Sequence, residues 1–279
     1  MTLDSSPALA DAARFQFGAN WRQFLRLLDE DRIAEAQHSL HELLGVESLD
    51  GKSFLDVGCG SGLFSLAARR DGATVHSFDY DVQSVACAEE LRERYFPKDG
   101  QWNIEQGSVL DQAYLSSLGR FDFVYAWGVL HHTGALWSAL DNVLLSLAEA
   151  GTLSVSIYND QDRVSQRWRT IKRLYNRSPG ALRTLLVIAV GAFFESRSAL
   201  IRLIRLQNPL PFRDWAEKKR TRGMSVWYDL VDWVGGYPFE VAKPEQVFDF
   251  YRQRGYKLVR LTTQGAGHGC NEFVFVVGP

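Results

Sequence analysis

The sequence predicts an α/β fold built on a doubly wound, mostly parallel sheet. Apolar runs suited to strands alternate with helical stretches from residue 53 to residue 158, which is typical of parallel sheets with helices on both faces. A glycine-rich turn directly follows the first of these runs. Because ligands on such sheets bind beyond the carboxyl ends of the strands, this turn is expected to belong to a binding site.

The elements follow in order along the chain. Residues 14–44 are expected to be helical, because apolar residues recur there at helical intervals. Asp81 is suited to cap one later helix, and Gly151 to stop another. The predicted strands are 53–57, 73–78, 102–106, 121–126 and 152–158, and the predicted helices among them are 81–95 and 136–148.

The alternation breaks after residue 158, and no convincing strand follows until about residue 240. Because a structureless loop of roughly 80 residues is improbable, this segment is expected to be an inserted helical cap over the mouth of the active site. Its predicted helices are 162–176, 180–206 and 212–219, followed by a helix at 244–254 and strands at 256–262 and 271–277. The predicted domains are a helical lid (1–50), a cofactor-binding core (51–158), the cap (159–240) and a terminal helix and hairpin that complete the core (241–279).

The composition is that of a globular protein. The chain has 279 residues, of which 46% are hydrophobic and 23% charged, enough for one large domain or a domain with an insertion. Its three cysteines have no paired spacing, which argues against a disulfide framework and a zinc site. The first residues include Asp4 and Asp11 and do not read as a signal peptide. We therefore expect a cytoplasmic protein.

The glycine-rich turn holds the most specific motif. Residues 54–62 run from an apolar strand through Asp56 into Gly58-x-Gly60-x-Gly62. Glycines permit positive φ and a close backbone approach to a ligand, and a helix that starts there directs free N–H groups at it. Asp79 follows 17 residues after Gly62, at the end of the next strand, where a carboxylate can accept both ribose hydroxyls. The spacing differs from the G-x-G-x-x-G of dinucleotide-binding proteins.

On these motifs the chain resembles the class I S-adenosylmethionine-dependent methyltransferases. The resemblance covers about residues 53–158 and, weakly, the two terminal strands. It implies a Rossmann-like, seven-stranded sheet, mostly parallel, with an antiparallel hairpin at its edge. It also implies S-adenosyl-L-methionine as cofactor, with the glycine loop around its amino-acid end and Asp79 on its ribose.

The resemblance implies roles for further residues. Asp56 would brace the loop or accept from the methionine ammonium, and Cys59 would be a small filler in it. Tyr80 would pack against the adenine, and the turn at Ser108 and Val109 would reach the adenine edge, while Asp111 either joins them or caps a helix. The predicted cofactor-binding residues are Asp56, Gly58, Cys59, Gly60, Gly62, Asp79, Tyr80, Ser108, Val109 and Trp127.

The fourth strand ends at the methyl-transfer point of this family. The run Val129-Leu130-His131-His132 looks like that of the quinol O-methyltransferases and their small-molecule relatives. Their carboxylates for a divalent ion are replaced by Gly128, His131 and His132, so no metal is expected. The Asn/Asp-Pro-Pro motif of base N-methyltransferases is also missing, which argues against DNA as a substrate.

His131 and His132 are the candidate catalytic residues. Histidine titrates near neutrality, so either side chain can take a proton from the acceptor as the methyl arrives. Alternatively, both histidines only hold the wall of the cofactor site. A base is not obligatory, because holding the reactants in line and excluding water can supply much of the rate.

The substrate side is predicted from composition alone. The segment 222–240 is dense in aromatic, acidic and glycine residues, which suits the wall of a small-molecule pocket better than a plain amphipathic helix; packing of the cap is the alternative. Residues near the start could form a lid, and the loop 265–272 could close over the substrate. The predicted substrate-binding residues are Asn20, Trp21, Tyr228, Asp229, Asp232, Trp233, Tyr237 and Asn271.

The cap is strongly basic although the whole chain has a net charge of −2. Residues 160–222 contain twelve arginines and three lysines against three aspartates and two glutamates. This charge indicates a solvated helical face or an anionic partner, such as a substrate, a membrane surface or RNA. The apolar run 181–206 is interrupted by charges, so we expect core packing or contact with a membrane interface in preference to a span.

The sequence therefore predicts an enzyme that transfers a methyl group from S-adenosylmethionine to a small-molecule or lipid-like acceptor. Oxygen is the first expected target atom, followed by carbon or nitrogen, and anionic molecules are among the candidate acceptors. An RNA methyltransferase that uses the basic cap is the first alternative, although no RNA-binding module is recognisable. A non-catalytic protein that binds the cofactor is the second.

Overall fold

A computed structural model of the protein describes residue 15 and residues 17–210, 226–265 and 269–278. The chain divides into two compact units. The sheet unit comprises Gln16–Ser165 and Phe239–Pro279, and the helical unit comprises Met1–Phe15 and Gln166–Pro238.

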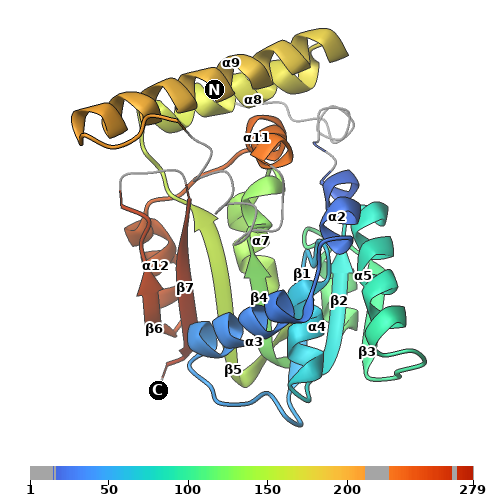
Figure 1. The fold of residues 1–279 in the computed structure, drawn as a ribbon. Helices are drawn as coiled ribbons and strands as arrows, with labels where there is room; N and C mark the ends of the chain where they lie inside the picture. Colours follow the sequence, from blue (N-terminus) through green and yellow to red (C-terminus); the bar gives the residue numbers. More distant parts are fainter. Residues whose placement is uncertain (1–14, 16, 211–225, 266–268, 279) are drawn as a thin grey trace. The chain divides into compact units, whose positions relative to one another are not determined.

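A seven-stranded sheet forms the centre of the sheet unit (Figure 1). Its order is β3-β2-β1-β4-β5-β7-β6, in which β7 pairs antiparallel with β5 and β6 and the other pairs are parallel. The strands are β1 (Ser53–Val57), β2 (Thr74–Asp79), β3 (Trp102–Gln106), β4 (Phe121–Trp127), β5 (Leu147–Tyr158), β6 (Tyr256–Thr262) and β7 (Cys270–Val277). The predicted mostly parallel, doubly wound sheet with an antiparallel terminal hairpin is confirmed.

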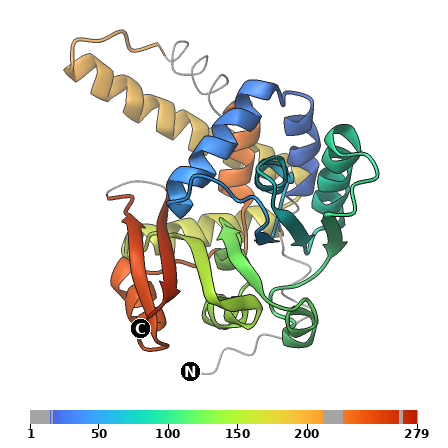
Figure 2. The ribbon, with the colours of Figure 1, turned by 90° about the horizontal axis from the view of Figure 1, so that it is seen from below.

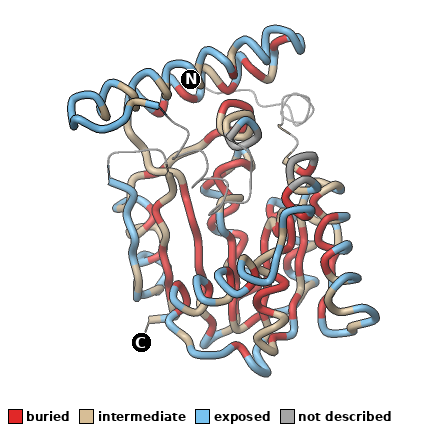
Figure 3. Tube along the Cα trace, in the orientation of Figure 1, coloured by how far each residue is buried: buried red, intermediate tan, exposed pale blue. Residues whose placement is uncertain are grey.

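Helices cover both faces of this sheet, as the view in Figure 2 shows. One face carries α3 (Glu30–Leu44), α4 (Leu63–Arg70) and α5 (Val82–Tyr95), and the other carries α6 (Gln112–Ser117), α7 (Leu136–Asn142) and α12 (Pro244–Arg252). The central strands are buried on both sides and form the core (Figure 3). Asp81 caps α5 through the backbone N–H of Gln83, as predicted.

Two helix boundaries differ from the sequence prediction. The helical stretch expected at 14–44 is two helices in its described part, α2 (Gly18–Leu25) and α3, because Asp29 caps α3 through the backbone N–H of Arg32. The helix expected at 136–148 ends at Asn142 and continues as a short 3-10 turn. The strand β5 then begins at Leu147, which is buried and pairs with Phe121, so pairing along β4 overrides the helical pattern.

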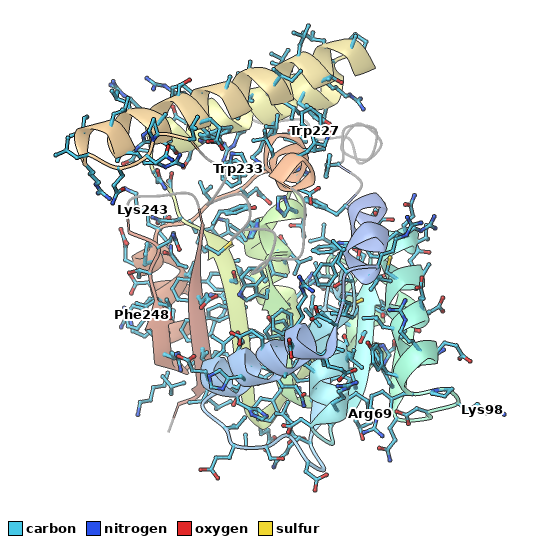
Figure 4. All side chains as sticks on the ribbon, in the orientation of Figure 1. Arg69, Lys98, Trp227, Trp233, Lys243 and Phe248 are labelled. Carbon is cyan, nitrogen blue, oxygen red and sulfur yellow. The ribbon has the colours of Figure 1, made fainter. Side chains whose placement is uncertain are left out.

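The described part of the helical unit contains α8 (Arg163–Arg177, which begins in the sheet unit), α9 (Gly180–Ile204) and α11 (Val226–Gly235). Tyr175, Val187 and Val234, one from each helix, form its small buried cluster. The segment 222–240, whose composition suits a pocket wall better than a plain amphipathic helix, contains the helix Val226–Gly235, as the packing alternative allowed; Figure 4 labels Trp227 and Trp233 on this helix. The helix predicted at 212–219 lies outside the described residues.

Candidate active site

The glycine loop joins β1 to α4 in a conformation that depends on its glycines. Gly58, Gly60 and Gly62 all have positive φ, at 71°, 55° and 81°. A Cβ on Gly58 would lie 2.2 Å from the side chain of Val129, and one on Gly62 would lie 2.8 Å from the Cβ of Ala88. The loop therefore tolerates no side chain at either position, and its backbone passes directly against the residue that precedes the 3-10 helix η1 (Leu130–His132).

Asp79 ends β2 and is tied to the same loop. Its Oδ2 accepts from the backbone N–H of Gly60 at 3.0 Å, and its Oδ1 accepts from the N–H of Asp81 at 2.8 Å. These bonds orient the carboxylate at the carboxyl end of the strand, beside the glycine loop. This is the position from which a carboxylate accepts sugar hydroxyls in doubly wound folds.

Asp81 extends this arrangement to the first described helix. Its Oδ2 accepts from the N–H of Gly18 at 3.0 Å, at the start of α2. A Cβ on Gly60 would meet the ring of Trp21, in the same helix, at 3.2 Å. The predicted lid residue Trp21 therefore lies against the glycine loop. Asn20 belongs to α2 as well, but its side chain lies outside the described residues.

Asp56 lies beneath the loop and is buried. Ser65 donates from its Oγ to Asp56 Oδ2 at 2.5 Å, Ser77 donates to Ser65, and Trp102 Nε1 donates to Ser77. Burial raises the pKa of Asp56 to about 7, although the Ser65 hydrogen bond opposes this shift and the charge of Asp79 adds to it. Of the two predicted roles, these contacts fit bracing of the loop.

Three of the other predicted cofactor residues have clear surroundings. Cys59 is buried and its pKa is raised well above the usual range, first by desolvation, so its thiol is an inert filler. Tyr80 is exposed beside Asp79. The Val109 side chain lies in the main core, so in this turn the backbone and Ser108 remain for the adenine edge. Asp111 caps α6 through the N–H of Tyr114, which resolves that alternative.

Trp127 marks the carboxyl end of β4. Its side chain is exposed, and its Nε1 donates to Glu272 Oε1 at 2.9 Å. Gly128 follows with a φ of 74°, and a Cβ on this residue would meet nothing within 4 Å. The strand end therefore carries an indole held by a carboxylate from β7.

His131 and His132 lie in an aromatic cluster directly after this strand end. The His131 ring is 4.0 Å from the Tyr158 ring and 4.5 Å from that of His132, and His132 is 5.0 Å from Phe17. His131 is completely buried, whereas His132 is 7% exposed. The His131 carbonyl accepts from the N–H of Glu240. The structure thus brings the two predicted histidines together and leaves His132 as the more accessible of them.

Two polar candidates have structural partners. Asn271 is buried; its Nδ2 donates to Asn159 Oδ1 at 3.1 Å, and its Oδ1 accepts from the N–H of Gln264. These bonds join the start of β7 to the residue after β5 and to the segment after β6. Glu240, from the predicted pocket segment, accepts from the N–H of Leu136 with both oxygens, at 3.1 and 3.2 Å, at the start of α7. Glu240 therefore fixes the backbone next to the histidines, and Asn271 holds the residue that follows Tyr158.

The remaining substrate candidates belong to the helical unit. Trp233 packs against Trp168 at 5.2 Å, and the buried Lys172 amine lies 4.4 Å from its ring and donates to its carbonyl oxygen. Burial lowers the pKa of Lys172 to about 7, with Asp232 acting in the opposite direction. The Tyr237 ring lies 6.0 Å from the guanidinium of Arg173. The side chains of Tyr228 and Asp229, in α11, lie outside the described residues. A role of these residues in substrate binding stays a prediction.

Sequence reasoning missed Tyr158, which is central to the histidine cluster. Its ring contacts His131, His132 and Phe239 at 4.0, 5.5 and 5.3 Å. The available signal was its place as the last residue of a strand, at the same sheet edge as Asp79 and Trp127. Among the described residues, no group of three or more His, Cys, Asp or Glu side chains is arranged to hold a metal ion.

These features fit a nucleoside-binding site on a Rossmann-like fold. The glycine loop, the carboxylate at the end of β2 and the turn after β3 fit the class I S-adenosylmethionine-dependent pattern. A family model described as "Methyltransferase domain" matches residues 28–205, and the chain belongs to this family. The prediction of a class I S-adenosylmethionine-dependent methyltransferase, and of an enzyme, is confirmed.

One curated protein similar to part of this chain is a methyltransferase. The ribosomal protein L11 methyltransferase of Helicobacter hepaticus is 31% identical over 86 residues, which are 30% of this chain and 26% of that protein. The chain thus matches about a quarter of the length of this curated relative.

Two solved structures share the fold over nearly the whole chain. The magnesium protoporphyrin IX methyltransferase of Synechocystis PCC 6803, with bound SAM, has a TM-score of 0.55 at 14% identity and covers 99% of both chains. The 1,6-didemethyltoxoflavin-N1-methyltransferase of Burkholderia thailandensis has a TM-score of 0.53 at 14% identity, covering 100% of this chain and 93% of the other. At this identity the likeness shows the fold.

Proposed function

We propose that this protein transfers the methyl group of S-adenosylmethionine to an oxygen of a small-molecule or lipid-like acceptor. The observation that carries the proposal is the contact of Val129 with Gly58. It brings the segment of the histidine pair against the loop predicted to hold the amino-acid end of the cofactor. Both of these structural neighbours act on small molecules by their names, which supports this class of acceptor.

The residues present fit this cofactor. The three positive-φ glycines have no side chains that would keep a ligand away from the loop backbone. Two backbone N–H groups orient Asp79 at the end of β2. When bound, the cofactor supplies an electrophilic methyl group on a sulfonium. Asp79 would hold the ribose, Tyr80 would lie on the adenine, and Ser108 would contact its edge.

The histidine cluster would orient the acceptor and remove its proton. His132 is proposed as the group that takes the proton from the acceptor hydroxyl, because it is the less buried of the pair and imidazole titrates near neutrality. His131, Tyr158 and Phe17 would orient it and exclude water. General-base catalysis of this kind contributes roughly 10²–10⁴-fold to a rate.

RNA is the second candidate acceptor. Helix α8 carries five arginines and one lysine without an acidic residue, and such a helix suits a phosphate backbone. A protein acceptor, as the name of the L11 methyltransferase indicates for that enzyme, is supported only by the quarter-length match. We propose that the protein works in the cytoplasm, which its sparse, unpaired cysteines favour.

The test is to incubate the purified protein with methyl-labelled S-adenosylmethionine and a cell extract separated into small-molecule, lipid, RNA and protein fractions. Label in the small-molecule or lipid fraction is expected, and the bond should resist base if it is an ether. Label found in the RNA or protein fraction would show that the acceptor belongs to that class and would contradict the proposed small-molecule or lipid-like acceptor. Asp79→Ala serves as the inactive control for label incorporated by contaminants.

A further inference from the structure

Helix α9 presents two different faces. Its inner face packs within the helical unit: Val187 lies in the cluster with Tyr175 and Val234, and the Phe194 ring is 5.7 Å from that of Trp168. Gly191 lies on the same side, where a Cβ would meet Leu230 of α11 at 2.7 Å. These positions recur at the 3.6-residue helical period. The packing fixes which side of α9 faces away from the unit.

The outer face of α9 is apolar and exposed. Leu185, Phe193 and Leu203 are 61%, 63% and 54% exposed, and Val187 is the one buried residue of this fully described helix. Figure 3 shows the exposed colour along its length. At the helical period the outward positions carry apolar or small side chains and no charge: Leu182, Leu185, Ala189, Ala192, Phe193, Ser196, Leu200 and Leu203.

The charges of α9 outside this face are almost all positive. Helix α9 contains Arg183, Arg197 and Arg202 and a single acid, Glu195, all away from the outward positions. Arg183 donates to the Ser178 carbonyl and lies 5.7 Å from the Tyr175 ring, which ties α9 to the preceding helix. That helix, α8, adds exposed arginines and no acid within its 15 residues. Across residues 163–210 there are nine arginines and one lysine against one glutamate.

We propose that α9 lies in the plane of an anionic lipid bilayer, with its outer face in the upper acyl region and the arginines of α8 and α9 at the phosphate headgroups. An apolar face bordered by arginines is what an interfacial helix requires, and basic residues near an anionic leaflet add attraction. This surface is independent of the methyl acceptor, so it does not rest on the proposed function.

Charge complementarity favours this occupant over the alternatives. By length and composition α9 is also the one helix in the described part of the chain that could cross a membrane, so the expectation that its charges rule out a span does not hold on composition alone. A span would, however, place Glu195 and Arg197 in the hydrocarbon, where charged residues are costly, and would require the inner face to leave its aromatic contacts. A second copy of the same face would bring like charges together.

The test is flotation of the full-length protein with vesicles of phosphatidylcholine alone and with vesicles containing about a third phosphatidylglycerol. Binding is expected only to the anionic vesicles, because attraction to the headgroups is needed beside the apolar face. High salt or alkaline carbonate should release the bound protein, since an interfacial helix does not span. Equal binding to both vesicles, no binding to either, or release only by detergent would overturn the proposal.

Two sets of variants locate the surface. Leu185→Asp with Leu203→Asp should lower vesicle partitioning by at least roughly tenfold, because both side chains would bury apolar area in lipid. Val259→Asp, at a residue of β6 that is 53% exposed, is the matched control and should bind as the parent does. Arg167→Glu with Arg177→Glu should also lower binding by at least roughly tenfold, against the control pair Lys98→Glu and Lys257→Glu.

The changed residues are exposed, so circular dichroism and the thermal midpoint should stay unchanged. Unchanged vesicle binding in the α9 and α8 variants, or an equal loss in the control variants, contradicts the assignment. Size-exclusion chromatography distinguishes the second-copy alternative: a parent dimer that the α9 variants convert to a monomer, without vesicle binding, would also overturn it.

Discussion

At the scale of single residues, position in the sheet decides what each side chain can do. Asp56 and Asp79 lie near the carboxyl ends of the paired strands β1 and β2. Asp56 is buried and its pKa is raised to about 7, whereas Asp79 accepts from two backbone N–H groups beside the loop. Only Asp79 is therefore suited to grip a sugar as a carboxylate. His131 and His132 are adjacent in sequence and also differ in burial, because His131 is completely buried and His132 is slightly exposed.

Replacing Asp79 by alanine should weaken binding of S-adenosylmethionine by about 10- to 100-fold, because a charged acceptor contributes roughly 1.5–3 kcal/mol. Isothermal titration calorimetry with S-adenosylhomocysteine measures the change. Glu245→Ala, at an exposed carboxylate in the first turn of α12, is the control. Unchanged affinity in Asp79→Ala would remove this residue from the site.

Replacing His132 by asparagine should lower kcat by at least about 100-fold with nearly unchanged cofactor affinity, because a general base acts in the chemical step. His131→Asn should lower the stability of the fold more than the chemistry, since its ring is completely buried. The pH profile of kcat should lose its acidic limb in His132→Asn. An unchanged pH profile of kcat in this variant would show that His132 only lines the cofactor site and is not the base.

At the scale of elements, the conformation of the glycine loop depends on a residue that is far away in the sequence. Gly58 needs its positive φ to turn out of β1, and it needs the missing Cβ because Val129, from the segment after β4, occupies that space. The need for a positive φ is visible in the sequence motif itself. The need for a missing Cβ arises only because β1 and β4 pair side by side.

Substituting alanine at Gly58 should therefore cost more than its φ alone. Gly45 has nearly the same φ, 70°, with nothing within 4 Å of a Cβ, so Gly45→Ala isolates the backbone cost of about 1–2 kcal/mol. Gly58→Ala should exceed this loss in urea unfolding and also weaken cofactor binding. Equal effects of the two substitutions would contradict the contact with Val129.

At the scale of the whole molecule, two buried ionisable groups make stability depend on pH in opposite directions. The folded-state pKa of Asp56 is raised from 3.8 to about 7, so the native state holds the extra proton and stability falls as pH rises from about 4 to about 7. The pKa of Lys172 is lowered from 10.5 to about 7, so stability rises with pH from about 7 to about 10.

Asp56→Asn should flatten the fall in stability between pH 4 and 7, and Lys172→Met should flatten the rise between pH 7 and 10, in urea unfolding at a series of pH values. Because the two residues lie in different units, their effects should add. An unchanged slope in either variant would contradict burial of that group in the folded state.

The central strands were predictable because burial on both faces produces continuous apolar runs, as in β1. The edge strands β3 and β6 alternate in burial instead, and β1, β3 and β6 all have their predicted bounds. The start of β5 was not predictable, because Leu147 fits a helical pattern until β4 lies beside it. The composition of α11 did not favour a helix, because Trp233 packs against Trp168 of α8 and Val234 lies in the buried cluster, contacts that its own pattern does not reveal.

The sequence alone determined the class of this protein. The glycine spacing, the carboxylate at the end of the next strand and the alternation of strands and helices all lie in one continuous stretch of chain, so they can be read without the fold. The tertiary structure decided the surroundings of those residues: Asp56 is buried beneath the glycine loop, Asp79 accepts from two backbone N–H groups beside it, Asn271 and Glu240 hold the backbone, and Tyr158 joins the histidines. The physical reason is that burial, pKa and side-chain partners arise from contacts between segments far apart in the chain, which no local pattern contains.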